Sequence, residues 1–342
     1  MSKFALVDLS NLFHRARYGA MADPDSKAGL AMLIIFRSLR KLYRELQVDH
    51  MVFAVDRGSW RYAVYPAYKS RRVSERMDAT PREQDEQHRF FVSFDALLRY
   101  LSTQTRCTVL AAPEIEGDDF IARWIIRHPA DEHVIVSGDS DFVQLIAENV
   151  CIFDPMGQRM LTRDGVSDEH GVKMAFLVSS KDGKIKTTGR DSEFVAEPEW
   201  WRKSLFIKLL RGDVSDSVFS AYPGVRYEGK KCSIRAAWED RIDQGYDWNN
   251  LMFQTWDKLL ESGEVERVRV IDQFRINEQV IDLTKQPQTI IQRMDATIDG
   301  AGAAPSVRNV GIQFLRFCAM QDLPALAKEA TEHVGYLNAS CP

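Results

Sequence analysis

The feature that most constrains this chain is a pair of carboxylates placed directly after a buried strand. In "HVIVSGDSDFVQLI", residues 133–146, the apolar run Val134–Val136 predicts a buried strand, and Phe142 begins a helical pattern. Between these two patterns stand Asp139 and Asp141, where a turn needs only one acid. Because open parallel sheets bind ligands outside the carboxyl ends of their strands, this doubling predicts a functional site.

Acids also follow the other predicted strands. "KFALVDL", residues 3–9, and "MVFAVD", residues 51–56, both run into an aspartate, and a third strand at 107–112 leads into "PEIEGDD". The segment "RGDVSDS" adds two acids three residues apart, on one face of a predicted helix N-terminus. The acids that we predict as metal ligands are Asp8, Asp56, Glu116, Asp118, Asp119, Asp139, Asp141, Asp213 and Asp216.

The simpler explanation for any one of these acids is helix capping. An aspartate at a strand–helix junction accepts backbone N–H bonds, and Asp118, Asp119 and Asp139 are candidates for that role. Capping does not explain why the acids are doubled, or why they recur at every predicted strand end. Converging carboxylates repel one another strongly unless cations bind among them. We therefore expect a metal site.

The chemistry of the donors predicts which metal binds. Carboxylate oxygens favour Mg²⁺ or Mn²⁺ over Zn²⁺. The number of acids predicts two ions, which together stabilise the attacking and leaving oxygens of a phosphoryl displacement. We expect two Mg²⁺ ions, for which Mn²⁺ can substitute. The five cysteines and seven histidines are scattered without metal-ligand spacing, so no zinc site and a reducing compartment are expected.

A basic segment follows the second predicted strand. Residues 57–76, "RGSWRYAVYPAYKSRRVSER", hold six basic residues and one acid, with Trp60, Tyr62, Tyr65 and Tyr68 interleaved. Positive charge binds phosphates, and aromatic faces stack on exposed bases. The alternative is a solvated loop with spare arginines. Its position beside Asp56 favours a nucleic-acid contact, and the net charge of −4 then describes a polarised molecule.

Alternating strands and helices up to about residue 155 predict an α/β fold with a parallel sheet. Residues 162–198 are polar and predict an exposed loop or hairpin, and the chain from 199 onward, including 250–262, reads as mainly helical. We therefore expect one domain over 1–198 and a second over 199–342. The longest apolar run, "GLAMLIIF", is too short to cross a membrane, and we expect a cytoplasmic protein.

The motifs together resemble the flap endonuclease and 5′-to-3′ exonuclease family. The resemblance lies in "VDLSNLFHR", "FAVDRGSWRYAVYPAYKSRR", "EIEGDDFIARWI", "VSGDSDFVQLI" and "LLRGDVSDS", in that order over about residues 4–220. The polar loop before "LLRGD" and the stretch "FRINEQVIDLTKQP" are most similar to the T-even phage ribonuclease H branch. The resemblance implies a PIN-like 5′-nuclease domain with a helical arch at about 60–95. It also implies a helical C-terminal domain that binds duplex DNA through a helix-three-turn-helix-like element.

The activity implied by the resemblance is a metal-dependent, structure-specific 5′ nuclease. Such an enzyme removes RNA primers and 5′ flaps during lagging-strand DNA replication, with exonuclease, flap endonuclease and ribonuclease H activities. The implied substrates are branched or 5′-flap DNA and RNA–DNA duplexes. The implied partners are single-stranded-DNA-binding protein and the replication polymerase. We expect a monomer, in the host-cell cytoplasm if a bacteriophage encodes it.

The resemblance also assigns roles to matching residues. It places Asp8, Asp56, Glu116, Asp118 and Asp139 around one metal, and Asp141, Asp213 and Asp216 around the second, with Asp119 in an outer position. The residues implied to act in catalysis are Lys69, Arg72 and Asp139. Those implied to contact nucleic acid are Arg61, Tyr68, Lys69, Arg71, Arg72, Arg226, Lys230 and Lys231. For Phe13 and His14, stacking on a terminal base and helix packing both remain open.

One motif departs from the family pattern. The duplex-binding element usually reads GDxxDNIPGVxGIGxKTA, whereas this chain reads "GDVSDSVFSAYPGVRYEGKKCSIRAA". Ser217 replaces the asparagine and extra residues precede Pro223, so a backbone cation site in this hairpin is in doubt. The T-even branch departs in a similar way.

Two other functions are compatible with parts of the pattern. A PIN-type endoribonuclease carries similar acids, but it would lack the arch segment and the "RGDVSD" motif. A branched-DNA-binding protein that has lost catalysis would lack some of the acids, and none is missing here. Both alternatives therefore explain less of the sequence than a 5′ nuclease does.

Overall fold

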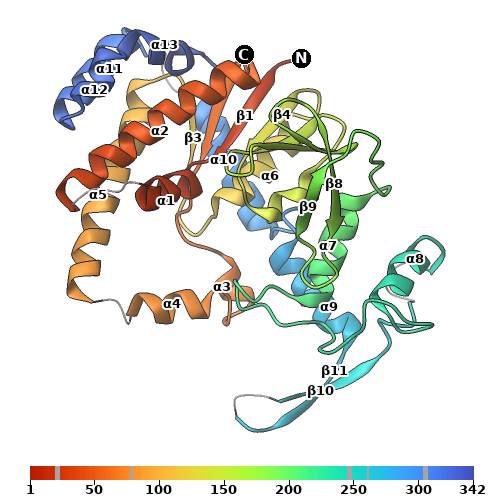
Figure 1. Ribbon diagram of the computed structural model, residues 1–342. Coiled ribbons are helices and arrows are strands. Elements are labelled where there is room, and N and C mark those ends of the chain that lie inside the picture. The colour runs from red at the N-terminus through yellow and green to blue at the C-terminus, as the bar shows by residue number, and fades with distance from the viewer. Residues whose placement is uncertain (20–23, 78–79, 245–248, 260–261, 303–306) are drawn as a thin grey trace.

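A nine-stranded mixed sheet organises the protein, in the order β3-β2-β1-β4-β5-β6-β7-β8-β9 (Figure 1). The computed structural model describes residues 1–19, 24–77, 80–244, 249–259, 262–302 and 307–342. The strands of this sheet are β1 (Lys3–Asp8), β2 (His50–Ala54), β3 (Thr108–Leu110), β4 (Glu132–Val136), β5 (Val150–Asp154), β6 (Arg159–Thr162), β7 (Gly165–Asp168), β8 (Lys173–Val178) and β9 (Ile185–Arg190). The first five strands pair in parallel, and β6 to β9 continue the sheet in antiparallel pairs. The predicted α/β fold is confirmed.

Helices connect the parallel strands and cover both faces of this part of the sheet. The helices of this half are α1 (Leu9–Gly19), α2 (Pro24–Leu46), α3 (Arg61–Val64), α4 (Ser70–Met77), α5 (Pro81–Gln104), α6 (Gly117–Arg127) and the 3₁₀ helix η1 (Ser140–Leu145). Along β1, Ala5 and Val7 join the core under α2 and α5, whereas Phe4 and Leu6 join the core under α6. Burial on both faces explains why this strand is an unbroken apolar run.

The helices α3, α4 and α5 depart from the layered body. The arm formed by α4 and the N-terminal part of α5 projects beyond the sheet (Figure 1). The first turn of α5 is fixed by a capping box between Thr80 and Glu83, with Pro81 at its first position. Farther along α5, Phe94, Leu97 and Leu101 are buried against the sheet. The predicted arch segment therefore spans α3, α4 and the exposed start of α5.

The second half contains more strand than predicted. Residues 162–198 hold β7, β8 and β9, so the expected hairpin is present as part of the main sheet. The helix expected over 250–262 is wrong: β10 (Thr255–Leu259) pairs with β11 (Val265–Arg269) in a separate hairpin. Exposure alternates along β10, and Trp256 donates a hydrogen bond to the Ala221 carbonyl at 2.7 Å. Gly263, with φ of 84°, supplies the left-handed backbone of the turn.

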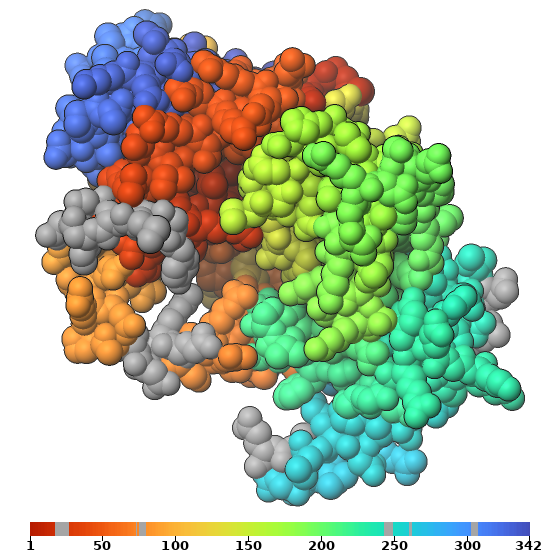
Figure 2. All heavy atoms as spheres, viewed as in Figure 1, coloured from red at the N-terminus to blue at the C-terminus, as the bar shows by residue number. Residues whose placement is uncertain are grey.

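The region 199–342 is not one packing unit. Its helices are α7 (Trp200–Arg211), α8 (Ile234–Gln244), α9 (Val270–Ile281), α10 (Gln288–Gly302), α11 (Val310–Met320), α12 (Pro324–Lys328) and α13 (Ala330–Asn338). Helices α7, α8 and α9 share a core with Tyr65 and Tyr68 of the arch segment. Helix α10 packs on β3 and α6, and α11 to α13 pack with α2 and α5. Figure 2 shows the C-terminal helices in blue against the orange-red surface of α2.

The expected boundary at residue 198 therefore separates two sequence patterns and does not separate two cores.

Within the ranges that the structure describes, no helix has both the length and the hydropathy needed to cross a membrane.

Candidate metal centre and nucleic-acid interface

The carboxyl ends of β1, β2 and β4 deliver the first acids to one edge of the sheet. Asp8 ends β1 and accepts a hydrogen bond from the Asn11 N–H at 3.0 Å. Asp56 follows β2 and accepts the Gly117 N–H at 2.7 Å. Asp139 follows β4 and accepts the Asp141 N–H at 3.0 Å. These acids therefore do cap backbone N–H groups, as the simpler explanation predicts, and they also converge.

Burial and mutual repulsion raise the pKa values of these acids. We call Asp8, Asp56, Asp118 and Asp139 the crowded acids. Burial, followed by the charge of Asp56, raises the pKa of Asp8 to about 7. Burial and then Asp141 raise the pKa of Asp139 to about 6. Burial and then Asp8 raise the pKa of Asp118 well above its ordinary value. The crowded acids thus bind protons more readily than ordinary aspartates, and a bound cation would relieve their repulsion.

A second set of acids has counter-ions built into the protein. We call Glu116, Asp119, Asp141 and Asp213 the paired acids. Glu116 accepts hydrogen bonds from Arg61 Nη1 at 2.6 Å and from Lys69 Nζ. Burial alone would raise the pKa of Glu116, but Lys69 and Arg61 lower it below its ordinary value.

Lys208 provides the counter-ion for the other paired acids. Its Nζ forms ion pairs with Asp141 and, at 2.8 Å, with Asp213. Burial lowers the pKa of Lys208, but these two acids more than offset it and leave the pKa raised. Burial alone would raise the pKa of Asp213, but Lys208 lowers it well below the ordinary value.

Sequence reasoning missed Lys208. The available signal was a lysine inside the apolar run "SLFIKLLRGD", just before the predicted ligand Asp213.

Asp216 lies between the two sets. One carboxylate oxygen from each of Asp141, Asp213 and Asp216 lies within 4.8 Å of the others. Arg72 pairs with Asp216 at 2.8 Å, yet burial outweighs the nearby Lys69 and Arg72 and raises the pKa of Asp216. An all-oxygen cluster of this kind fits a hard divalent cation.

Asp119 supports the site from behind. It is fully buried and accepts hydrogen bonds from Trp60 Nε1 at 3.0 Å, from Arg61 at 2.8 and 2.9 Å, and from Gln286 at 3.2 Å. Its oxygens are thus occupied by protein donors. Because Arg61 also binds Glu116, Asp119 helps to fix the position of that acid through Arg61.

The structure places Arg61, which we expected to contact nucleic acid, inside the protein. Arg61 is 2% exposed, and its guanidinium bonds to Glu116, Asp119 and the Val280 carbonyl. Tyr68 is likewise buried, at 5% exposed, and its hydroxyl donates to Glu116 and lies 3.2 Å from Asp216. The physical reason is that the basic segment folds inward at α3, where the acids need counter-charge and hydrogen-bond donors.

The other basic residues of the arch segment remain near the surface. Lys69 is partly exposed beside Glu116, and Arg72 is half exposed beside Asp216. Arg71 is exposed at the start of α4. Arg226, Lys230 and Lys231 are exposed between α7 and α8, and no ion pair among the described residues joins them to the acids.

The structure separates the two aromatic candidates of α1. Phe13 is buried, with its ring centroid 4.1 Å from that of Phe90 and 4.4 Å from that of Phe94, so its role is helix packing. His14 is exposed and meets the half-exposed Phe91 edge-on at 6.2 Å. These two rings form an accessible aromatic pair beside Asp56. Burial raises the pKa of Asp56, and the charge of His14 offsets a small part of that rise.

Comparison with known proteins places the chain in a family. The family model for the "5'-3' exonuclease, N-terminal resolvase-like domain" matches residues 3–171. A flap endonuclease Xni from Aeromonas hydrophila is 32% identical over 182 residues, covering 51% of this chain and 63% of the relative. A 5'-3' exonuclease from Mycobacterium tuberculosis is 24% identical over 240 residues, covering 67% of this chain and 68% of that protein. The thermostable DNA polymerase I of Thermus filiformis is 28% identical over 234 residues, and the match spans 67% of this chain but only 23% of the polymerase.

Solved structures agree on the fold. A bacteriophage T5 flap endonuclease in a pseudo-enzyme–product complex with DNA and metal ions aligns with a TM-score of 0.53 at 14% identity, over 87% of this chain and 99% of that one. A T5 5'-exonuclease with bound zinc aligns with a TM-score of 0.51 at 14% identity, over 97% of this chain and 99% of that one. The similarity therefore extends beyond the N-terminal domain into the C-terminal helices.

Proposed function

Because the chain belongs to the 5'-3' exonuclease and flap endonuclease family, we propose that it is a divalent-metal-dependent, structure-specific 5′ nuclease. It hydrolyses phosphodiesters at the 5′ ends and flaps of DNA and in RNA paired with DNA. The observation that carries this proposal is the gathering of carboxylates at one site, where oxygens of Asp141, Asp213 and Asp216 lie within 4.8 Å of one another and the charges of Asp8 and Asp139 raise the pKa of Asp118 further above the value that burial alone would give. A bound divalent cation relieves that crowding.

The metal ligands divide between two ions. Asp8, Asp56, Glu116, Asp118 and Asp139 hold one ion, and Asp141, Asp213 and Asp216 hold the other, with Mg²⁺ as the natural ion and Mn²⁺ as a substitute. When bound, the ions stabilise negative charge on the reacting phosphate and favour deprotonation of the attacking water. The small separation of the Asp141, Asp213 and Asp216 oxygens supports the second group.

The cations of the arch segment act on the substrate. Lys69 and Arg72 lie beside Glu116 and Asp216, where each contacts the scissile phosphate once metals have taken over the charge of those acids. Arg71, exposed on the same helix, binds a flanking phosphate. These cations provide the attraction that a phosphodiester needs in order to approach an acidic centre.

The helices after the nuclease domain hold the duplex. Arg226, Lys230 and Lys231 are exposed between α7 and α8, where they bind duplex phosphates without reading bases. Helices α7, α8 and α9 share a core with Tyr65 and Tyr68, which connects this region to the arch segment. The duplex-binding part is then about 199–281, and the nuclease domain comprises 1–198 completed by the C-terminal helices.

Replication is the expected setting. The match to part of a DNA polymerase I supports a polymerase as the working partner. Removal of RNA primers, single-stranded-DNA-binding protein as a partner, the monomeric state, the cytoplasmic location and the T-even ribonuclease H branch stay predictions.

The deciding experiment is cleavage of a 5′-labelled flap duplex with Mg²⁺ or with EDTA, beside an unpaired RNA of the same length. Mg²⁺-dependent release of short 5′ products from the branched duplex alone is the expected result. Cleavage of the free RNA with the duplex left intact would instead establish the PIN-type endoribonuclease. Tight binding of the flap without cleavage would establish the branched-DNA-binding protein.

A further inference from the structure

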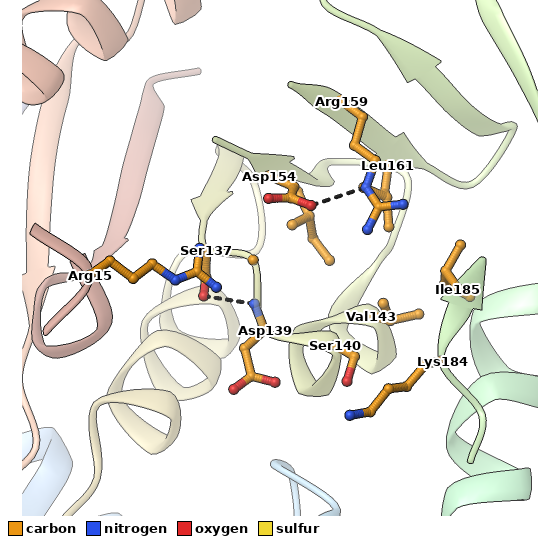
Figure 3. A pocket seen from close by; sticks show the side chains of 12 residues that line it. Arg15, Ser137, Asp139, Ser140, Val143, Asp154, Arg159, Leu161, Lys184 and Ile185 are labelled. Carbon is orange, nitrogen blue, oxygen red and sulfur yellow. Dashed lines mark hydrogen bonds and ion pairs between the residues drawn. The ribbon is translucent and has the colours of Figure 1, made fainter. Parts of the chain in front are cut away.

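A separate pocket of about 310 Å³ opens on the far side of the Asp139 turn. Figure 3 shows Arg15 entering it from α1 and Lys184 reaching it from the turn before β9, on the opposite side. Of the predicted metal ligands, Asp139 lines this pocket, and the other eight do not. The volume suits one nucleotide and excludes a duplex.

The charge of this pocket is not balanced by its own acids. Asp154 is occupied, because it accepts hydrogen bonds from the Met156 and Gly157 N–H groups and from Arg159 Nε at 3.0 to 3.1 Å. In the described part of the chain, neither Arg15 nor Lys184 takes part in an ion pair. The pocket therefore presents two cations outside any close ion pair, beside a predicted metal ligand, although the charge of Lys184 also acts on Asp182.

The turn itself is shaped to admit the Arg15 side chain. A Cβ added at Gly138 would lie 2.7 Å from each terminal guanidinium nitrogen of Arg15. The guanidinium is the flexible end of a long side chain, and it lies so close to the backbone of this turn that a Cβ at position 138 would make it shift. The "SGDSD" motif thus positions a cation on one side of the turn and Asp139 on the other. The Ser140 hydroxyl, which also lines the pocket, adds a donor.

We propose that this pocket binds a phosphate of the strand being cut, adjacent to the scissile phosphate. The inference rests on the proposed nuclease function and extends it with a substrate subsite. Asp139 belongs to both the pocket and the metal centre, so one nucleotide of a strand spans the two. An internal phosphodiester and a terminal 5′-phosphate present the same anionic oxygens to Arg15 and Lys184.

The test combines neutralised phosphates with neutralised side chains. Flap substrates with a single uncharged methylphosphonate at successive positions around the cleavage point are cut by the wild type, by Arg15→Gln and by Lys184→Gln, and kcat/KM is measured. When the methylphosphonate stands at one position next to the scissile bond, we expect the kcat/KM of the wild type to fall roughly tenfold. On unmodified substrate, the kcat/KM of each variant should fall by a similar factor. Combining variant and modified substrate should then cost little more, because both remove the same contact.

Two comparisons make the result decisive. Lys186→Gln removes an exposed charge from β9 outside the pocket. At every methylphosphonate position, any loss of kcat/KM from this variant should add to the loss caused by the modified substrate. Substrates with a 5′-phosphate or a 5′-hydroxyl show whether the coupled phosphate is terminal or internal. Additive losses at all positions for Arg15→Gln and Lys184→Gln would overturn the subsite. Absence of flap cleavage by the wild type would instead overturn the nuclease function.

Discussion

The crowded acids and the paired acids are neighbours at one site, but their negative charge is compensated in different ways. Asp8, Asp118 and Asp139 have raised pKa values, because they are buried and repel one another. Glu116 and Asp213 remain ionised, because Lys69, Arg61 and Lys208 stand beside them and lower their pKa values.

The difference separates two kinds of charge compensation. The paired acids are stabilised from within, so they keep their arrangement without a ligand. The crowded acids need protons or an external cation, so their charge state depends on pH and on metal. A site that binds metal and also keeps its shape without metal needs both kinds of compensation.

The strongest test is Asp139→Asn, which removes one charge from the crowded acids and keeps the side-chain volume. Loss of a metal ligand should lower single-turnover cleavage of the flap by about 10³-fold or more. Binding of the flap, measured by fluorescence anisotropy, should be retained or tightened because an anion next to the phosphates is gone. The exposed Asp164→Asn is the matched control and should cleave normally. Cleavage by Asp139→Asn within tenfold of the wild type would contradict the role of the crowded acids.

Lys208→Met tests whether the paired acids depend on their internal counter-ion. Removing one partner of a buried ion pair costs about 3 kcal/mol or more, so in EDTA the free energy of unfolding should fall by that order. Saturating Mg²⁺ should restore part of the loss, since it replaces the missing positive charge between Asp141 and Asp213. Denaturant unfolding with and without Mg²⁺ measures both effects.

Lys203→Met on the same helix serves as its control. Lys203 is also buried, but it pairs with Glu197 at 2.7 Å, away from the acid cluster. Its loss of stability should not respond to Mg²⁺. Equal Mg²⁺ rescue of both variants would mean that the metal does not act between the paired acids.

Thermal unfolding of the wild type tests metal binding directly. A ligand that binds only the folded state at 100 times its Kd adds about 2.7 kcal/mol, which corresponds to a rise in Tm of roughly 5 °C. The rise should shrink in Asp8→Asn, which removes one of the crowded acids. Sodium chloride at equal ionic strength controls for general screening. An unchanged Tm on adding Mg²⁺ would show that the acids do not form a cation site.

The pH dependence of stability distinguishes the two sets without any substitution. The folded pKa of Asp8 is about 7 and that of Asp139 about 6, both above the ordinary 3.8, so between these values the folded state binds more protons than the unfolded state. In EDTA the free energy of unfolding should therefore fall as pH rises from about 4 to 7, by an amount on the order of 5 kcal/mol. Urea titrations across this range measure the slope. Mg²⁺ should flatten it, and a rise of stability with pH would contradict the crowding.

The smallest effect is expected for Tyr68→Phe. Burial and the charge of Glu116 raise the pKa of Tyr68, so its hydroxyl remains a donor between Glu116 and Asp216. Removing that hydroxyl should cost about 1 kcal/mol of stability. Tyr65→Phe, whose hydroxyl accepts the Phe219 N–H at 3.3 Å, removes a comparable group outside the acid cluster. A larger loss in Tyr65→Phe would show that the Tyr68 hydroxyl contributes little to the paired acids.

The sequence predicted the convergence of the acids well, because parallel strands with acids at their ends leave only one edge for those acids. It could not predict which side chains near that edge point into the protein and which point into solvent. Arg61 and Arg72 belong to the same basic segment, yet the first is buried and the second half exposed, since α3 folds under the acids and α4 leaves them. The apolar neighbours of Lys208 indicate that it is buried, but only the packing of α7 against η1 brings it to Asp141.

The fold shows the same limit at longer range. Local periodicity found the strands of the first half, but not the return of α10 to α13 to the nuclease core. That return depends on contacts such as Arg40 with Glu332 at 2.6 Å and the Arg106 N–H with the Leu337 carbonyl at 2.8 Å. No window of neighbouring residues contains both partners. The β10–β11 hairpin was missed for a related reason, because its residues are mostly exposed and carry little hydrophobic pattern.

The packing of α11 to α13 on α2 and α5 has a consequence for how the protein is made. The core around Phe36 and Tyr100 is completed by Phe314 and Phe317, which leave the ribosome long after their partners. Contacts of such sequence separation form late and slow folding. The nascent chain therefore carries an exposed apolar face on α2 and α5 until its last helices emerge, and a ribosome stalled before residue 310 would present that face to chaperones and proteases.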